Sequence, residues 1–106
     1  MALVFVTGGS RGLGLATAKA LSQQGHQIVL FAKNEALLKS AASELSANFE
    51  VVDLEQMDQT RKVFQSAVSK YGIPEILILA HGVMSDRTAK TLRTNDAEWR
   101  RVMAIN

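Results

Sequence analysis

Short apolar runs alternate along this chain with longer segments in which apolar residues recur every three or four positions. The short runs have the length and composition of β-strands. They cover residues 2–6, 27–32, 49–54 and 75–80. The longer segments have the spacing of amphipathic helices. They cover residues 12–24, 34–47 and 57–71.

This alternation predicts an α/β fold. Strands that alternate with helices form right-handed βαβ units, which give a doubly wound, Rossmann-type parallel sheet with helices on both faces. Three of the runs are almost continuously apolar, as expected for strands covered on both faces. The run at 49–54 contains Glu50 and Asp53, which suits an edge strand. We therefore expect a strand order of 3-2-1-4.

Residues typical of helix ends support the boundaries. Gly25 and Gly72 stand just after two of the predicted helices, where glycine is favoured. Asn34 is suited to cap the helix that follows it. One face of that helix is predicted to be apolar and to comprise Leu37, Leu38, Ala41, Ala42 and Leu45. Asn95 to Glu98 has the pattern of a capping box, which predicts a last helix that runs through Trp99 and turns Asn106 inward.

Composition narrows the possible functions. The 106 residues are enough for one domain, and 47% hydrophobic with 21% charged residues is ordinary globular composition. The net charge of +2 is scattered, so nucleic acid is not an expected partner. The chain has no cysteine, and its two histidines, His26 and His81, are isolated, so we expect no metal site. No apolar run is long enough to cross a bilayer, and we expect a cytoplasmic protein, with His26 at the surface.

The most informative motif is a glycine-rich turn between the first strand and the first helix. Such a turn brings backbone N–H groups close to a phosphate at the positive end of the helix. The alternative is a tight connection that binds no ligand. The residues expected to contact a nucleotide here are Thr7, Gly8, Ser10, Arg11, Gly12, Leu13 and Gly14.

The end of the second strand predicts which nucleotide is preferred. An NAD-binding site places an acidic residue about 20 residues past the turn, where it binds the ribose 2′-hydroxyl. Here the segment reads Phe31-Ala32-Lys33-Asn34, and the first carboxylate is Glu35. Arg11 and Lys33 supply positive charge that suits a 2′-phosphate, and Ser10 and Asn34 offer hydrogen bonds. We therefore expect NADP(H) rather than NAD(H), with a merely solvated Lys33 as the alternative.

Together these motifs resemble the short-chain dehydrogenase/reductase family over the whole chain. The family's Thr-Gly-x-x-x-Gly-x-Gly turn is matched by Thr7, Gly8, Gly12 and Gly14. Its aspartate at the end of the third strand is matched by Asp53, followed by Leu54. The resemblance implies that Asp53 meets the adenine amino group. A solvated carboxylate or a helix cap is the alternative for Asp53.

Further matches and one departure lie toward the end of the chain. The family's Trp-x-x-Val-x-x-x-Asn pattern is matched by Trp99, Val102 and Asn106, and Asn106 is implied to be a catalytic residue. A frayed terminus is the alternative for Asn106. The family's Asn-Asn-Ala-Gly is replaced by Leu79-Ala80-His81-Gly82. The resemblance implies that the backbone at Gly82 passes close to the adenosine ribose, with Ala80 and His81 beside it. A loop histidine packed at the end of the strand is the alternative for His81. A polar loop with a solvated face is expected to carry Arg87, Lys90 and Arg93.

The catalytic Tyr-x-x-x-Lys and upstream serine of the family have no match. Tyr71, the single tyrosine, closes a helix and is not followed by the required lysine. Residues 1–106 are therefore expected to form one incomplete Rossmann-type domain, the cofactor-binding N-terminal half of an enzyme that moves hydride between nicotinamide and a carbonyl or alcohol substrate. The resemblance implies a homo-oligomer for the complete protein and no activity for this part alone. A non-catalytic nucleotide-binding or interaction module is the alternative. With the other half absent, the strand at 75–80 is predicted to be an exposed edge that favours self-association.

Overall fold

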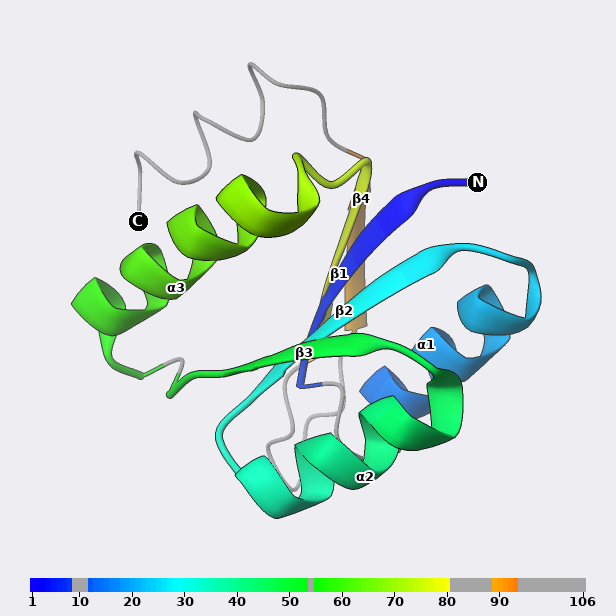
Figure 1. Ribbon diagram of the computed structural model, residues 1–106, viewed down its shortest axis with the longest axis horizontal. Coiled ribbons are helices and arrows are strands. Elements are labelled where there is room, and N and C mark those ends of the chain that lie inside the picture. The colour runs from blue at the N-terminus through cyan, green and yellow to red at the C-terminus, as the bar shows by residue number, and fades with distance from the viewer. Residues whose placement is uncertain (9–11, 54, 81–88, 94–106) are drawn as a thin grey trace.

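The computed structural model describes residues 1–8, 12–53, 55–80 and 89–93, and it confirms the alternation of strands and helices (Figure 1). The strands are β1 (Leu3–Thr7), β2 (Gln27–Ala32), β3 (Asn48–Val51), β4 (Ile76–Ala80) and β5 (Ala89–Arg93). The helices are α1 (Gly12–Gln23), α2 (Glu35–Leu45) and α3 (Met57–Tyr71). The predicted capping box and last helix lie outside the described residues.

The strands form one sheet in the order β3-β2-β1-β4-β5. β1 pairs in parallel with β2 and with β4, so that Val6 lies opposite Leu30 on one side and Ile78 on the other. β2 also pairs in parallel with β3. The predicted parallel order 3-2-1-4 is confirmed, and so is the edge position of β3.

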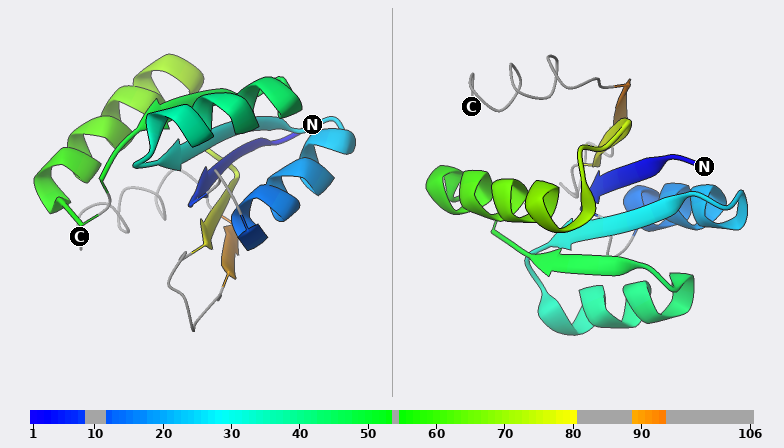
Figure 2. Two further views of the ribbon diagram at one scale, coloured as in Figure 1. Left: turned by 90° about the horizontal axis from the view of Figure 1, so that it is seen from below. Right: turned by 45° about the horizontal axis from the view of Figure 1, so that its top comes forward.

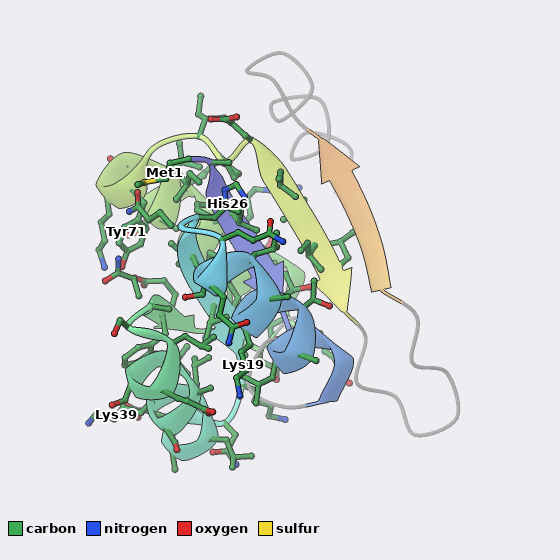
Figure 3. The ribbon with its side chains drawn as sticks, turned by 90° about the vertical axis from the view of Figure 1, so that its right-hand side faces the viewer. Met1, Lys19, His26, Lys39 and Tyr71 are labelled. Carbon is green, nitrogen blue, oxygen red and sulfur yellow. The ribbon has the colours of Figure 1, made fainter. Side chains whose placement is uncertain are left out.

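The prediction that β4 is an exposed edge is wrong. β5 runs antiparallel along β4, with Leu92 opposite Leu77, and the two strands lie side by side in Figure 3. A parallel pair needs a crossover of about a dozen residues or more, whereas β4 ends at Ala80 and β5 begins at Ala89, a separation that suits an antiparallel pair. The self-association inferred from a bare β4 edge loses its basis, because β5 satisfies the backbone groups of β4. Lys90 and Arg93 belong to this strand rather than to a polar loop, and Arg87 lies outside the described residues.

Both faces of the sheet are buried. Successive residues of a strand point to opposite faces. Val4, Val6 and Leu30 therefore face α1 and α2, whereas Phe5 and Phe31 face α3. Figures 1 and 2 show α3 on one side of the sheet and the other two helices across from it. The doubly wound arrangement with helices on both faces is confirmed.

The aromatic core lies under α3. The Phe31 ring has its centroid 5.0 Å from that of Phe5 and 4.5 Å from that of Phe64. These three side chains join β1, β2 and α3, so they fix the helix over the middle of the sheet.

The ends of α2 follow from local hydrogen bonds. Asn34 caps the helix as predicted, because its Oδ1 accepts the N–H of Leu37 at 3.0 Å. The helix ends at Leu45, since Ser46 adopts a left-handed conformation (φ 54°). The prediction for the apolar face is confirmed for four residues and wrong for Leu37, which is 42% exposed and lies at the margin of the face.

β3 is shorter than the predicted strand at 49–54. Val52 still donates its N–H to the carbonyl of Ala32, but the chain turns at Asp53. Asp53 Oδ1 accepts the N–H of Glu55 at 3.1 Å, a local side-chain bond that competes with strand pairing. This turn ends the strand and leads into α3.

Candidate functional site

The predicted site residues gather at one edge of the sheet. Because β1, β2, β3 and β4 are parallel, their carboxyl ends lie at the same edge, and α1 and α2 begin there. In doubly wound sheets, ligands bind at this edge. Thr7, Lys33, Asp53 and Ala80 all stand at or just after the end of a strand.

The two glycines that flank residues 9–11 of the glycine-rich turn have the backbone geometry that the sequence predicts. Gly8 and Gly12 have φ angles of 68° and 65°, which favour glycine. A Cβ placed on Gly12 would meet no atom within 4 Å, so the space beside the first residue of α1 is open. Gly14 is buried within the first turn of the helix. No acidic residue lies in the first turn of α1, so its N-terminus keeps its positive potential.

Two residues of the turn bind the sheet itself. The N–H of Gly8 donates to the carbonyl of Phe31 at 2.8 Å and ties the turn to the end of β2. Thr7 is buried, and its Oγ1 donates to the carbonyl of Ile78 at 3.3 Å. The Gly8 amide and the Thr7 hydroxyl therefore position the turn. The sequence pattern gave no signal for either bond.

The end of β2 presents a positive charge. Lys33 is exposed and lies between the last residue of β2 and Asn34, the cap of α2. The Oδ1 of Asn34 is engaged in the cap, whereas its amide NH₂ is a donor that the cap does not use. Glu35, the first carboxylate after the strand, is already the first residue of α2.

Asp53 is held firmly at the end of β3. Besides the bond from Glu55, its N–H donates to Oε1 of Gln59 at 3.1 Å. Its carbonyl lies 3.2 Å from the hydroxyl of Thr60, which it shares with the carbonyl of Gln56 at 2.8 Å. Its carboxylate Oδ2 lies 3.7 Å from Nζ of Lys33. The sequence predicted a separate role for each of these residues. The contact requires β2 and β3 to be neighbours, as predicted, and it also depends on the register of the two strands and the side-chain positions, which the sequence did not predict.

Several predicted site residues are placed only in part or not at all. Leu13 lies in α1, and Ala80 ends β4. The other predicted residues lie outside the described residues; they are Ser10, Arg11, Leu54, His81, Gly82 and Asn106.

Three polar contacts among other residues were not predicted from the sequence. His26, expected at the surface, is half-buried beside Met1, and its Nδ1 accepts the N–H of Ala2 at 3.0 Å (Figure 3). Tyr71 donates its hydroxyl to Oε2 of Glu50 at 2.9 Å, and Lys70 reaches the same oxygen. Burial, together with the hydrogen bond and negative charge of Glu50, raises the pKa of Tyr71 to about 12.

The edge of the sheet where the carboxyl ends of β1 to β4 lie, the carboxyl edge, fits an anionic nucleotide. The open space beside Gly12, the uncompensated helix N-terminus and the exposed Lys33 all favour phosphate groups. Within the described ranges, no cluster of three or more His, Asp or Glu side chains is placed to hold a metal ion. No helix in these same ranges has the length and apolarity needed to cross a membrane.

A parallel sheet in the order 3-2-1-4, covered by helices on both faces and with a glycine-rich turn that opens α1, defines a Rossmann-type α/β protein. A family model described as short chain dehydrogenase matches residues 2–106. The chain belongs to the short-chain dehydrogenase family.

Individual relatives agree with this assignment. The chain is 31% identical to a 3-oxoacyl-(acyl-carrier-protein) reductase of Chlamydia muridarum, over 95% of this chain and 42% of the relative. It is 32% identical to carbonyl reductase family member 4 of Danio rerio, over 98% of this chain and 44% of the relative. The crystal structure of L-sorbose reductase from Gluconobacter frateurii, complexed with NADPH and L-sorbose, is similar with a TM-score of 0.71 and 30% identity, over 82% of this chain and 35% of that one. The chain thus spans less than half the length of these relatives.

Proposed function

We propose that residues 1–106 form an incomplete Rossmann-type domain that binds NADP(H), as the N-terminal part of a short-chain dehydrogenase/reductase. The observation that carries this proposal is the glycine-rich turn at the start of α1 with the positive charge of Lys33 beside it. The similarity to a reductase whose crystal structure contains NADPH supports it.

Different residues of the carboxyl edge would contact different parts of the dinucleotide. The backbone from Gly8 to Gly14 and the N-terminus of α1 would face the pyrophosphate. Lys33 and Arg11 would bind the 2′-phosphate, with hydrogen bonds from Ser10 and the amide of Asn34. Asp53 would accept a hydrogen bond from the adenine amino group, with Leu54 beside it. Ala80, His81 and Gly82 would line the adenosine ribose.

The complete enzyme would act on a small carbonyl or alcohol substrate. The bound nicotinamide would supply or accept the hydride, and Asn106 would belong to the catalytic set. The catalytic serine, tyrosine and lysine of the family have no match in residues 1–106, so we expect no turnover by this part alone. We also expect the complete protein to be a cytoplasmic homo-oligomer.

A second candidate function is a nucleotide-binding or interaction module without catalysis. The observation that favours it is the position of Tyr71, the single tyrosine, which ends α3 and donates its hydroxyl to Glu50 of β3. General acid catalysis requires a donor close to the reacting oxygen. NADPH oxidation by the purified chain above background, tested with a panel of aldehydes and ketones, would exclude the non-catalytic module and would also contradict the expectation that this part alone is inactive.

Titration of the chain with NADP⁺ and NAD⁺ tests the proposed cofactor. Replacing Arg11 and Lys33 together with alanine should weaken NADP⁺ binding by about tenfold or more, because each charge-assisted bond contributes about 1.5–3 kcal/mol. NAD⁺ binding should change little. Lys39→Ala is the matched control, since it removes an exposed lysine of α2. Equal affinity of the unaltered chain for the two dinucleotides would contradict the preference.

A further inference from the structure

Two residues with separate proposed contacts to the dinucleotide are partners of each other within the chain. The Lys33 ammonium and the Asp53 carboxylate form an ion pair, with 3.7 Å between Nζ and Oδ2. The pair spans the carboxyl ends of β2 and β3, which are neighbours in the sheet. It lies where the proposed function places the adenosine end of the dinucleotide.

The two partners are held to very different degrees. The side chain of Asp53 is 25% exposed, and its Oδ1 and backbone are fixed by bonds to Glu55, Gln59 and Thr60. The side chain of Lys33 is 75% exposed. Asp53 is therefore the fixed member of the pair, and Lys33 is the member that can turn toward another anion.

A 2′-phosphate would compete with Asp53 for this lysine. An exposed ion pair is weak, because solvent screens both charges. A phosphate monoester carries up to about two negative charges and three acceptor oxygens, so it attracts the ammonium more strongly than one carboxylate does. When Lys33 turns to the phosphate, its ion pair with Asp53 is lost, and this loss reduces the net gain from binding the phosphate.

We propose that Asp53 is a specificity-determining counter-ion of Lys33, which lowers the preference of this site for a 2′-phosphorylated dinucleotide over an unphosphorylated one. This role rests on the proposed function and adds to it a coupling between two residues. The adenine contact alone would make Asp53 equally important for both dinucleotides. Because of the ion pair, the charge of Asp53 affects binding of the 2′-phosphorylated dinucleotide more than binding of the unphosphorylated one.

The Asp53→Asn variant separates these two roles. Asparagine keeps an acceptor oxygen for Glu55 and for an adenine amino group, and it removes the charge. The ratio of the NADP⁺ to the NAD⁺ association constant should rise about two- to fivefold at low salt, the scale of an exposed ion pair. The gain should shrink as salt increases. Glu55→Gln removes a charge two residues away that is not paired with Lys33, and it should change the ratio less.

A second background tests whether the effect passes through Lys33. In a Lys33→Gln chain, Asp53→Asn should change the ratio no more than Glu55→Gln does. In the unaltered chain, the NMR resonance of ¹³C-methylated Lys33 should move with NADP⁺ and stay in place with NAD⁺. This measurement does not depend on the folding of any variant.

The outcomes distinguish this inference from the proposed function. An unaltered chain that binds neither dinucleotide overturns both. Binding of the dinucleotides with an unchanged or lowered ratio in Asp53→Asn overturns the counter-ion role alone. An equal rise of this ratio in chains with and without Lys33 also overturns the counter-ion role, because the effect would then be general repulsion between Asp53 and the phosphate.

Discussion

The hydroxyl of Thr7 donates to the carbonyl of Ile78 across 71 residues of sequence, and it does so from a buried position. The bond joins the carboxyl ends of β1 and β4, where the glycine-rich turn begins. Among the described residues, Thr7 is the one polar residue in the buried core. A polar group at such a position is stable only with a partner, so this hydroxyl belongs to the framework of the site.

Replacing Thr7 with valine should therefore act mainly on stability. Valine has nearly the same shape but no hydroxyl, and loss of the bond should lower the free energy of unfolding by about 1 kcal/mol. Urea unfolding measures the change. Thr7→Ser keeps the hydroxyl and is the control for the polar contact. A valine variant as stable as the unaltered chain would show that the Ile78 carbonyl does not need this donor.

The cap of α2 gives a second prediction. Asn34→Ala removes the acceptor for the Leu37 N–H and should lower the free energy of unfolding by about 1 kcal/mol. Asn34→Asp keeps an acceptor oxygen and should restore most of the loss. If both variants unfold at the same urea concentration, the cap contributes nothing measurable.

Adjacent leucines of α2 allow a matched comparison of burial. Leu38 has no exposed surface, whereas Leu37 is 42% exposed. Leu38→Ala should lower the free energy of unfolding by about 2–5 kcal/mol, because it leaves a cavity between α2 and the sheet. Leu37→Ala should change the free energy of unfolding by no more than about 0.5 kcal/mol. Comparable losses in the two variants would contradict the orientation of α2.

Tyr71 should make stability depend on alkaline pH. Its pKa is about 12 in the folded chain and about 10 when unfolded, so folding favours the protonated phenol. The resulting stabilisation is fully present below pH 10 and is lost as the pH rises from about 10 to 12. The difference in free energy of unfolding between the unaltered chain and Tyr71→Phe should therefore narrow over this range.

Glu50→Gln is the control for the same contact. It removes the carboxylate that accepts the hydroxyl, so it should bring the pKa of Tyr71 closer to its usual value without removing the ring. An ultraviolet titration of the phenol measures the pKa of Tyr71 directly. An unchanged midpoint would mean that burial alone is responsible for the raised pKa.

Much of the fold follows from local signals in the sequence. An apolar run predicts the bounds of β2, and glycines mark the ends of α1 and α3. One asparagine predicts the cap of α2. Each of these signals lies within a few residues of the feature it predicts. The glycine-rich turn belongs to the same class, because positive φ angles at Gly8 and Gly12 are a local requirement. The parallel order 3-2-1-4 also followed, since strands alternating with helices allow few topologies.

The tertiary structure alone decided the contacts between residues far apart in the chain. The pairing of β5 with β4, the bond from Gly8 to Phe31 and the ion pair of Lys33 with Asp53 all depend on which strands are neighbours and in what register. A residue's own sequence neighbours carry no information about such a partner. The sequence by itself thus determined every described element except β5, together with the place of the candidate site. The packing of those elements determined which of the described site residues hold one another.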